Sequence, residues 1–167
     1  TWVEQIIRPR GFDITQAGIT GALMMVGGIF GAAILPVFSD KFRKRKFFMV
    51  LTSICVIPGL IGLTFAGNYI LLLASSIAFG FFLMAGGPIC YQYSAEICYP
   101  APEATSQGLL MLVGQISGII FIFGMDIAAG DSPSKTPAMI VFIVLMMINI
   151  FLNLQLRESK LVQADEI

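Results

Sequence analysis

A few polar and charged side chains in this sequence could do chemistry, and they stand out because long apolar runs surround them. Gln115 lies about ten residues into the run 105–125, where its amide would sit near the middle of a bilayer. Such an amide has two N–H donors and one acceptor oxygen. It can bind a polar ligand in a cavity, or it can form a hydrogen bond that holds two helices together. Gly118 follows on the same helical stripe and would leave room for a ligand beside the amide.

Tyr91 is a further candidate, at the polar end of the run 69–94. Its ring could line the pathway of a ligand together with Gln115 and Gly118, which would make these three residues a substrate cavity. Tyrosines also gather where a membrane meets water, so a position at the interface explains Tyr91 equally well.

A second group of charged residues is expected at one end of the apolar runs. The stretch 39–47 reads SDKFRKRKF, and Glu96 should lie at the same membrane depth. The carboxylate of Glu96 would pair with Arg43 or Arg45. A pair that breaks in one conformation acts as a gate, whereas a permanent pair is only an interfacial salt bridge. Asp40 is expected to hold this loop against the N-terminus of a neighbouring helix.

The sequence offers little for other kinds of chemistry. It contains no histidine, the commonest side chain for acid–base catalysis and metal binding near neutral pH. Its three cysteines, Cys55, Cys90 and Cys98, do not have the spacing of a metal site. We therefore predict no catalytic residue, no metal site, no cofactor and no enzyme activity.

The composition predicts the elements that position these residues. The chain of 167 residues is 57% hydrophobic and 12% charged, whereas a soluble domain has about 25% charged residues. Five runs are long enough to cross the bilayer, for which a helix needs about 20 residues. These spans are expected at about 14–38, 47–66, 69–94, 105–125 and 137–156. The runs are apolar all round and lack the alternation of membrane strands, which predicts an all-α integral membrane protein with the lipid bilayer as its surroundings.

Two glycine pairs suggest how the helices pack. Gly27-x-x-x-Gly31 lies in the first run and Gly114-x-x-x-Gly118 in the fourth. Small residues four apart let two helix backbones approach closely, and for the first pair we favour this packing role over contact with a substrate. Pro36 is expected to kink or end the first helix.

The basic residues predict the orientation in the membrane. Loops rich in Lys and Arg stay on the cytoplasmic side, which places the loop 39–46 and the C-terminus in the cytoplasm. The expected location is the plasma membrane. The inner side would then hold seven cations and the outer side three. The seven are the five within 41–46 with Arg157 and Lys160, and the three are Arg8, Arg10 and Lys135. A nucleic-acid patch is the alternative for the basic loop, but apolar helices flank it closely on both sides, so no nucleic-acid partner is expected.

Two motifs resemble known families. The segment Asp40–Arg45, DKFRKR, resembles the D-[RK]-x-G-[RK]-[RK] signature of the major facilitator superfamily, with Arg43 where that signature has Gly. The segment 95–110 reads AEICYPAPEATSQGLL and is followed by Gln115 and Gly118. This resembles the A-E-I-x-Y-P…E-x-T-S-x-G-L-L…Q-x-x-G pattern of the feline leukaemia virus subgroup C receptor-related transporters.

The resemblance implies a fold and a function. The five spans would be helices eight to twelve of twelve, so that 1–167 forms most of the C-terminal six-helix bundle and the missing N-terminal half of the same protein is its partner. The superfamily moves small organic solutes by alternating access, and this branch is associated with choline, ethanolamine and haem. The glutamine that matches Gln115 faces the central cavity in that branch. The resemblance leaves the substrate open between an amine-type and a haem-like molecule.

Three functions compete at this point. The first is a secondary active transporter for a small organic solute. The second is a non-transporting membrane subunit whose polar residues only pack helices together. The third, an intramembrane enzyme, is disfavoured by the lack of histidine and of any acid–base pair.

Overall fold

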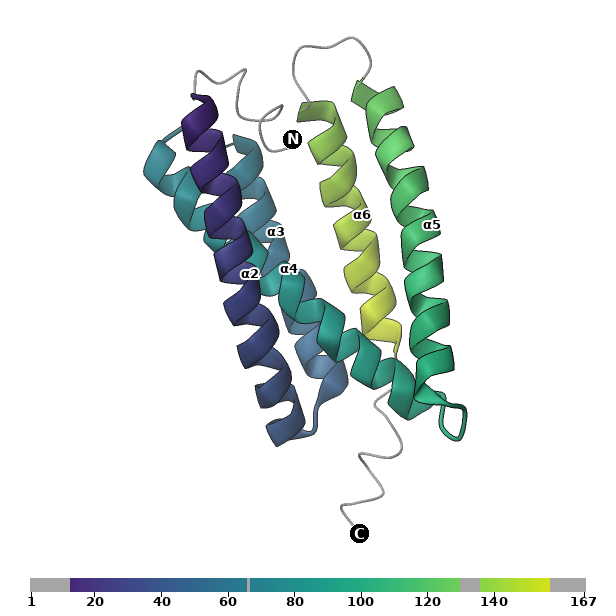
Figure 1. The fold of residues 1–167 in the computed structure, drawn as a ribbon. Coiled ribbons are helices and arrows are strands. Elements are labelled where there is room, and N and C mark those ends of the chain that lie inside the picture. Colours follow the sequence, from purple (N-terminus) through teal and green to yellow (C-terminus); the bar gives the residue numbers. More distant parts are fainter. Residues whose placement is uncertain (1–12, 66, 130–135, 157–167) are drawn as a thin grey trace.

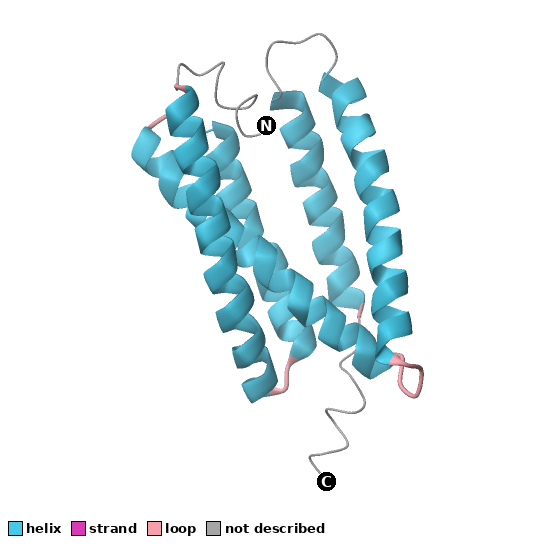
Figure 2. Cartoon of the chain, viewed as in Figure 1, coloured by secondary structure: helices cyan, strands magenta, loops and turns pink. Residues whose placement is uncertain are grey.

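The long apolar runs form helices in the computed structural model, which describes residues 13–65, 67–129 and 136–156. No strand occurs among these residues, so the predicted all-α fold is confirmed (Figure 2). The five helices are α2 (Ile14–Phe42), α3 (Arg45–Phe65), α4 (Tyr69–Ile97), α5 (Glu103–Ala129) and α6 (Thr136–Gln155).

The helices have the length and composition of membrane spans. Among the described residues, four apolar segments are long enough to cross a bilayer: α2, α3, α4 and the part of α5 from Glu103 to Gly124. The helix α6 has 20 residues, and its described apolar part is Ile140–Gln155. Several helices extend beyond the apolar runs, and α2 continues through the buried Pro36 to Phe42, so this proline does not end it. A proline inside a membrane helix is tolerated because neighbouring helices satisfy the backbone groups that it frees.

Polar side chains mark the helix starts. The Asp13 carboxylate accepts a hydrogen bond of 2.8 Å from the backbone N–H of Ile14, and Gln16 accepts one of 3.1 Å from the Asp13 N–H. The side chain of Asn68 likewise accepts a bond from the N–H of Ile70 at the start of α4. Capping of this kind satisfies N–H groups that have no partner within a helix, so these two residues determine where the helices begin.

The helix α4 lies at the centre of the packing and runs diagonally between the other helices (Figure 1). It packs most closely on α2, where a side-chain carbon added to Gly27 or Gly31 would collide with the backbone of Ile77 or Phe81. A side-chain carbon added to Gly80 of α4 would likewise collide with the backbone carbonyl of Met24. The predicted close packing at the first glycine pair is therefore confirmed.

Most of the buried apolar side chains form two clusters, one between α3, α4 and α6 and the other between α3 and α4. One cluster contains Val56, Leu60, Leu63, Leu72, Phe79 and Ile143, and the other contains Phe48, Met49, Ile89 and Tyr93. Neither cluster includes a described residue of α5, and Ser106 is the only residue described as buried in that helix. The helix α5 therefore presents an open face beside the packed helices.

Candidate functional site

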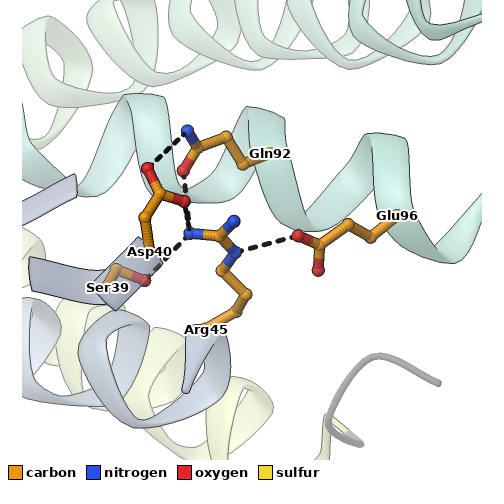
Figure 3. Close-up of polar contacts among 5 residues, drawn as sticks. All are labelled: Ser39, Asp40, Arg45, Gln92 and Glu96. Carbon is orange, nitrogen blue, oxygen red and sulfur yellow. Dashed lines mark hydrogen bonds and ion pairs between the residues drawn. The ribbon is translucent and has the colours of Figure 1, made fainter. Parts of the chain in front are cut away.

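The side chain of Arg45 joins three helices at one end of the bundle. Arg45 is the first residue of α3, and its guanidinium turns inward to contact α2 on one side and α4 on the other (Figure 3). Its Nε donates to Glu96 Oε1 at 3.0 Å. Its Nη1 forms an ion pair with Asp40. The structure thus brings Asp40, Arg45 and Glu96 together from three different helices.

Two uncharged side chains complete this group, which we call the Arg45 network. The Nη1 of Arg45 also donates to Gln92 Oε1 at 3.1 Å and to Ser39 Oγ at 3.5 Å. The amide of Gln92 donates in turn to Asp40 Oδ2 at 3.4 Å. Ser39 and Gln92 were not among the residues predicted for this site. The position of Gln92 four residues before Glu96 would have placed both on one face of α4.

The Arg45 network is largely buried but incompletely satisfied. The side chain of Arg45 is 11% exposed and that of Glu96 19%, whereas that of Asp40 is 48% exposed. Removing one partner of a buried ion pair typically costs about 3–5 kcal/mol, and exposed pairs contribute about 0–1 kcal/mol. Glu96 Oε2 is buried without a hydrogen-bond partner among the described residues and points away from Arg45. A buried acceptor without a partner is itself unfavourable. This penalty offsets part of the stabilisation that the other contacts of the Arg45 network provide.

Arg43, the other candidate for Glu96, occupies the C-cap of α2. Its backbone has φ 51° and ψ 32°, in the left-handed region, and its N–H donates to the Asp40 carbonyl at 3.2 Å. This is the position where the superfamily signature has glycine, which adopts such angles without steric strain. The tight turn therefore forms here with arginine, and the Arg43 side chain is exposed.

The residues predicted for the substrate cavity fall into two neighbouring hollows. Gln115 and Tyr91 line a cavity of about 480 Å³ between α4 and α5. Its other lining residues are Gly87 and Cys90 of α4, and Leu110, Met111, Val113, Gly114 and Ser117 of α5. We call it the Gln115 cavity. The amide of Gln115 is exposed, and it makes no hydrogen bond to any other residue that the structure describes.

Gly118 lines the second hollow, a cavity of about 720 Å³ between α5 and α6. Phe121 and Phe142 form part of its wall, and their ring centroids lie 5.3 Å apart. The two cavities share Gly114 and Ser117, so they meet along one face of α5. A side-chain carbon on Gly114 or Gly118 would meet nothing within 4 Å.

A separate polar cluster connects α3 and α6. The amide of Asn153 donates to Ser53 Oγ and to Asn149 Oδ1, both at 2.9 Å. The hydroxyl of Ser53 also donates to the Met49 carbonyl one turn earlier. Hydrogen bonds between membrane helices of this kind hold neighbouring helices together, and this cluster ties α6 to α3.

The length and composition of these helices define a multi-pass membrane protein. A model of the Major Facilitator Superfamily matches residues 2–165, nearly the whole chain. The chain therefore belongs to the major facilitator superfamily, and the resemblance noted in the sequence is confirmed.

Three relatives narrow the comparison. An uncharacterized protein of Caenorhabditis elegans is 34% identical over 129 residues, which cover 75% of this chain and 25% of that protein. Solute carrier family 49 member A3 of Danio rerio is 30% identical over 140 residues, 81% of this chain and 30% of that protein. The choline/ethanolamine transporter FLVCR2 of Rattus norvegicus is 32% identical over 111 residues, 64% of this chain and 20% of that protein. The chain thus spans at most 30% of the length of these relatives.

Proposed function

We propose that this chain is part of a secondary active transporter that moves a small organic solute by alternating access, and that it forms most of the C-terminal six-helix bundle, helices eight to twelve. The observation that carries the proposal is the Arg45 network, because it ties three helices together at one end of the bundle. Membership of the superfamily and the transporter names of several relatives support the same function.

The Arg45 network would act as the gate of this transporter. Arg45 holds Asp40 of α2 and Glu96 of α4 at once, so these helix ends separate only if its contacts break. The half-satisfied carboxylate of Glu96 lowers the cost of that opening, because its second oxygen would gain hydrogen bonds to water. Two states can interconvert only if the network is stable enough to form in one state and weak enough to break in the other.

The Gln115 cavity would bind the solute. Its volume of about 480 Å³ lies within the range of about 300–1,000 Å³ that is usual for small-molecule sites. The amide of Gln115 makes no other hydrogen bond within the described residues, so it is available to a ligand. Tyr91 adds an aromatic ring, which can attract a cationic amine. By analogy with the rat relative, choline and ethanolamine are the first solutes to test, and a haem-like molecule is the alternative.

The remaining part of the protein would cover the open face of α5. That face carries Gly114 and Gly118 without a neighbour, and the Caenorhabditis elegans and Danio rerio relatives are more than three times as long as the regions that match this chain. We expect an N-terminal half of the same protein to complete the central cavity here. The loop 39–46 and the C-terminus would face the cytoplasm at the plasma membrane, in keeping with the distribution of basic residues.

The decisive experiment measures uptake by the complete transporter in liposomes, with radiolabelled choline and ethanolamine. Gln115→Ala is expected to reduce the rate of uptake at least about fivefold, because a lost hydrogen bond to a ligand is worth about 1 kcal/mol or more. Gln155→Ala is the matched control, because Gln155 is an exposed residue at the end of α6 and lies outside both cavities. A variant Gln115→Ala with normal uptake and a lower melting temperature would mean that the amide only packs helices together.

A second candidate function is a non-transporting membrane subunit. The contacts among Ser53, Asn149 and Asn153 favour it, since these polar groups bond to one another between two helices. This second function predicts that the complete protein takes up no solute in liposomes but still binds other membrane proteins. Saturable uptake by the purified protein would exclude it.

A further inference from the structure

The basic loop has an outer surface that the Arg45 network does not use. Arg45 turns inward, whereas Lys41 and Lys44 are exposed and neither pairs with a carboxylate among the described residues. Arg43 is also exposed and Lys46 is partly exposed. The structure thus divides five neighbouring cations into one that holds helices together and four that lie on the outside.

The electrostatics of this surface favour an anion. Among the described residues, the carboxylates beside this surface are Asp40 and Glu96, and both are engaged by Arg45. The 21-residue helix α3 begins at Arg45, and its first turn contains no acidic residue. The positive end of that helix dipole therefore adds to the charges of the lysines instead of being neutralised.

Exposed aromatic rings flank the same cations. Phe38, Phe42 and Phe47 are exposed to 45%, 57% and 56%. The rings of Phe38 and Phe42 stack with centroids 6.4 Å apart, and Phe42 also stacks on Phe48 at 6.3 Å. A soluble anionic partner would leave these rings in water, whereas the boundary between acyl chains and headgroups would bury them while the lysines reach the headgroups.

We propose that the surface formed by Lys41, Phe42, Arg43, Lys44, Lys46 and Phe47, here called the loop surface, binds the headgroups of anionic membrane lipids. Clusters of four or more cations directly beside a membrane helix attract anionic lipids, with about a fivefold gain in affinity for each cation near the surface. The bound lipids hold the outer side of the turn, while Arg45 holds its inner side. This proposal goes beyond solute transport and does not depend on the identity of the solute.

The test is a titration of the complete protein in detergent with phosphatidylserine or phosphatidylcholine, followed by native mass spectrometry. The parent protein should prefer phosphatidylserine, and its preference should decrease as ammonium acetate concentration rises. The double variant Lys41→Gln/Lys44→Gln should bind phosphatidylserine about 25-fold more weakly, at about fivefold for each cation. The matched control Lys41→Arg/Lys44→Arg keeps both charges and should bind as the parent does.

Three results would overturn the proposal. The first is equal binding of the two lipids by the parent protein, which needs no variant and so does not depend on whether a variant folds. The second is unchanged phosphatidylserine binding by the glutamine variant. The third is complete displacement of phosphatidylserine by millimolar glycerol phosphate, which would mean that the loop surface recognises a soluble phosphate and not a lipid. Normal uptake with any of these results would leave the transport function intact.

Discussion

Two glycine pairs with the same spacing lie in opposite surroundings in this protein. Gly27 and Gly31 of α2 are buried and touch the backbone of α4, where Gly80 makes the approach reciprocal. Gly114 and Gly118 of α5 have no atom near the place where a side chain would begin. The motif therefore permits close packing without ensuring it, and a facing helix with its own small residue must complete the contact.

The difference extends to the regions around the two pairs. Around the first pair, α2 and α4 are in contact along much of their length, and Arg45 ties their ends together. Around the second pair, α5 borders two cavities of about 480 and 720 Å³ that share Gly114 and Ser117. The first region is built for stability and the second offers space, which is why the solute site is proposed beside α5 and the gate beside α2.

The largest expected effect comes from filling the packed glycine pair. Gly31→Leu would place a side chain against the backbone of Phe81, which cannot move aside without separating α2 from α4. We expect a loss of about 4 kcal/mol or more in the free energy of unfolding, the range reached by severe overpacking of a core. The midpoint of unfolding in detergent, compared with that of the parent protein, measures this loss of stability.

Gly118→Leu is the matched control for that substitution. It adds the same side chain to the open pair, where nothing lies within 4 Å. The stability of the helices described here should change by no more than about 0.5 kcal/mol, as for most surface substitutions. If both variants lose stability equally, the contrast between the two glycine pairs is wrong.

An intermediate effect is expected where Arg45 closes the packed region. Arg45→Gln leaves Asp40 and the partly buried Glu96 without their cation, and should lower the unfolding free energy by about 3 kcal/mol. Lys44→Gln removes the same charge from an exposed neighbour and should cost less than about 0.5 kcal/mol. The unfolding midpoints of the two variants should therefore differ clearly, and equal midpoints would show that the Arg45 network contributes little.

The smallest expected effect is a gain in stability at the turn between α2 and α3. Arg43→Gly relieves a left-handed residue, which costs about 1–2 kcal/mol for a residue with a side chain. Part of the gain is offset by the greater freedom of glycine in the unfolded chain, about 0.5–1 kcal/mol. A net increase of about 0.5–1 kcal/mol should raise the melting temperature slightly. A decrease would indicate that the Arg43 side chain makes a contact worth more than the strain of its backbone.

Local sequence determined the helices of this protein. Asp13 and Asn68 start α2 and α4 because their short polar side chains cap N–H groups within three residues along the chain. The apolar runs themselves predict membrane helices, since a backbone in lipid must satisfy its own hydrogen bonds. The motifs around Asp40 and Glu96 also indicated the superfamily before any fold was known.

The tertiary structure decided which of several similar residues form contacts between the helices. The sequence left Arg43 and Arg45 as equal partners for Glu96, and the geometry of the turn separates them. Arg43 adopts the left-handed cap of α2, whereas Arg45 begins α3 and turns between α2 and α4. The sequence likewise did not show which of the two glycine pairs packs against another helix. Contacts of this kind join residues about 50 positions apart, and they depend on the path of α4 across the bundle, which no local pattern records.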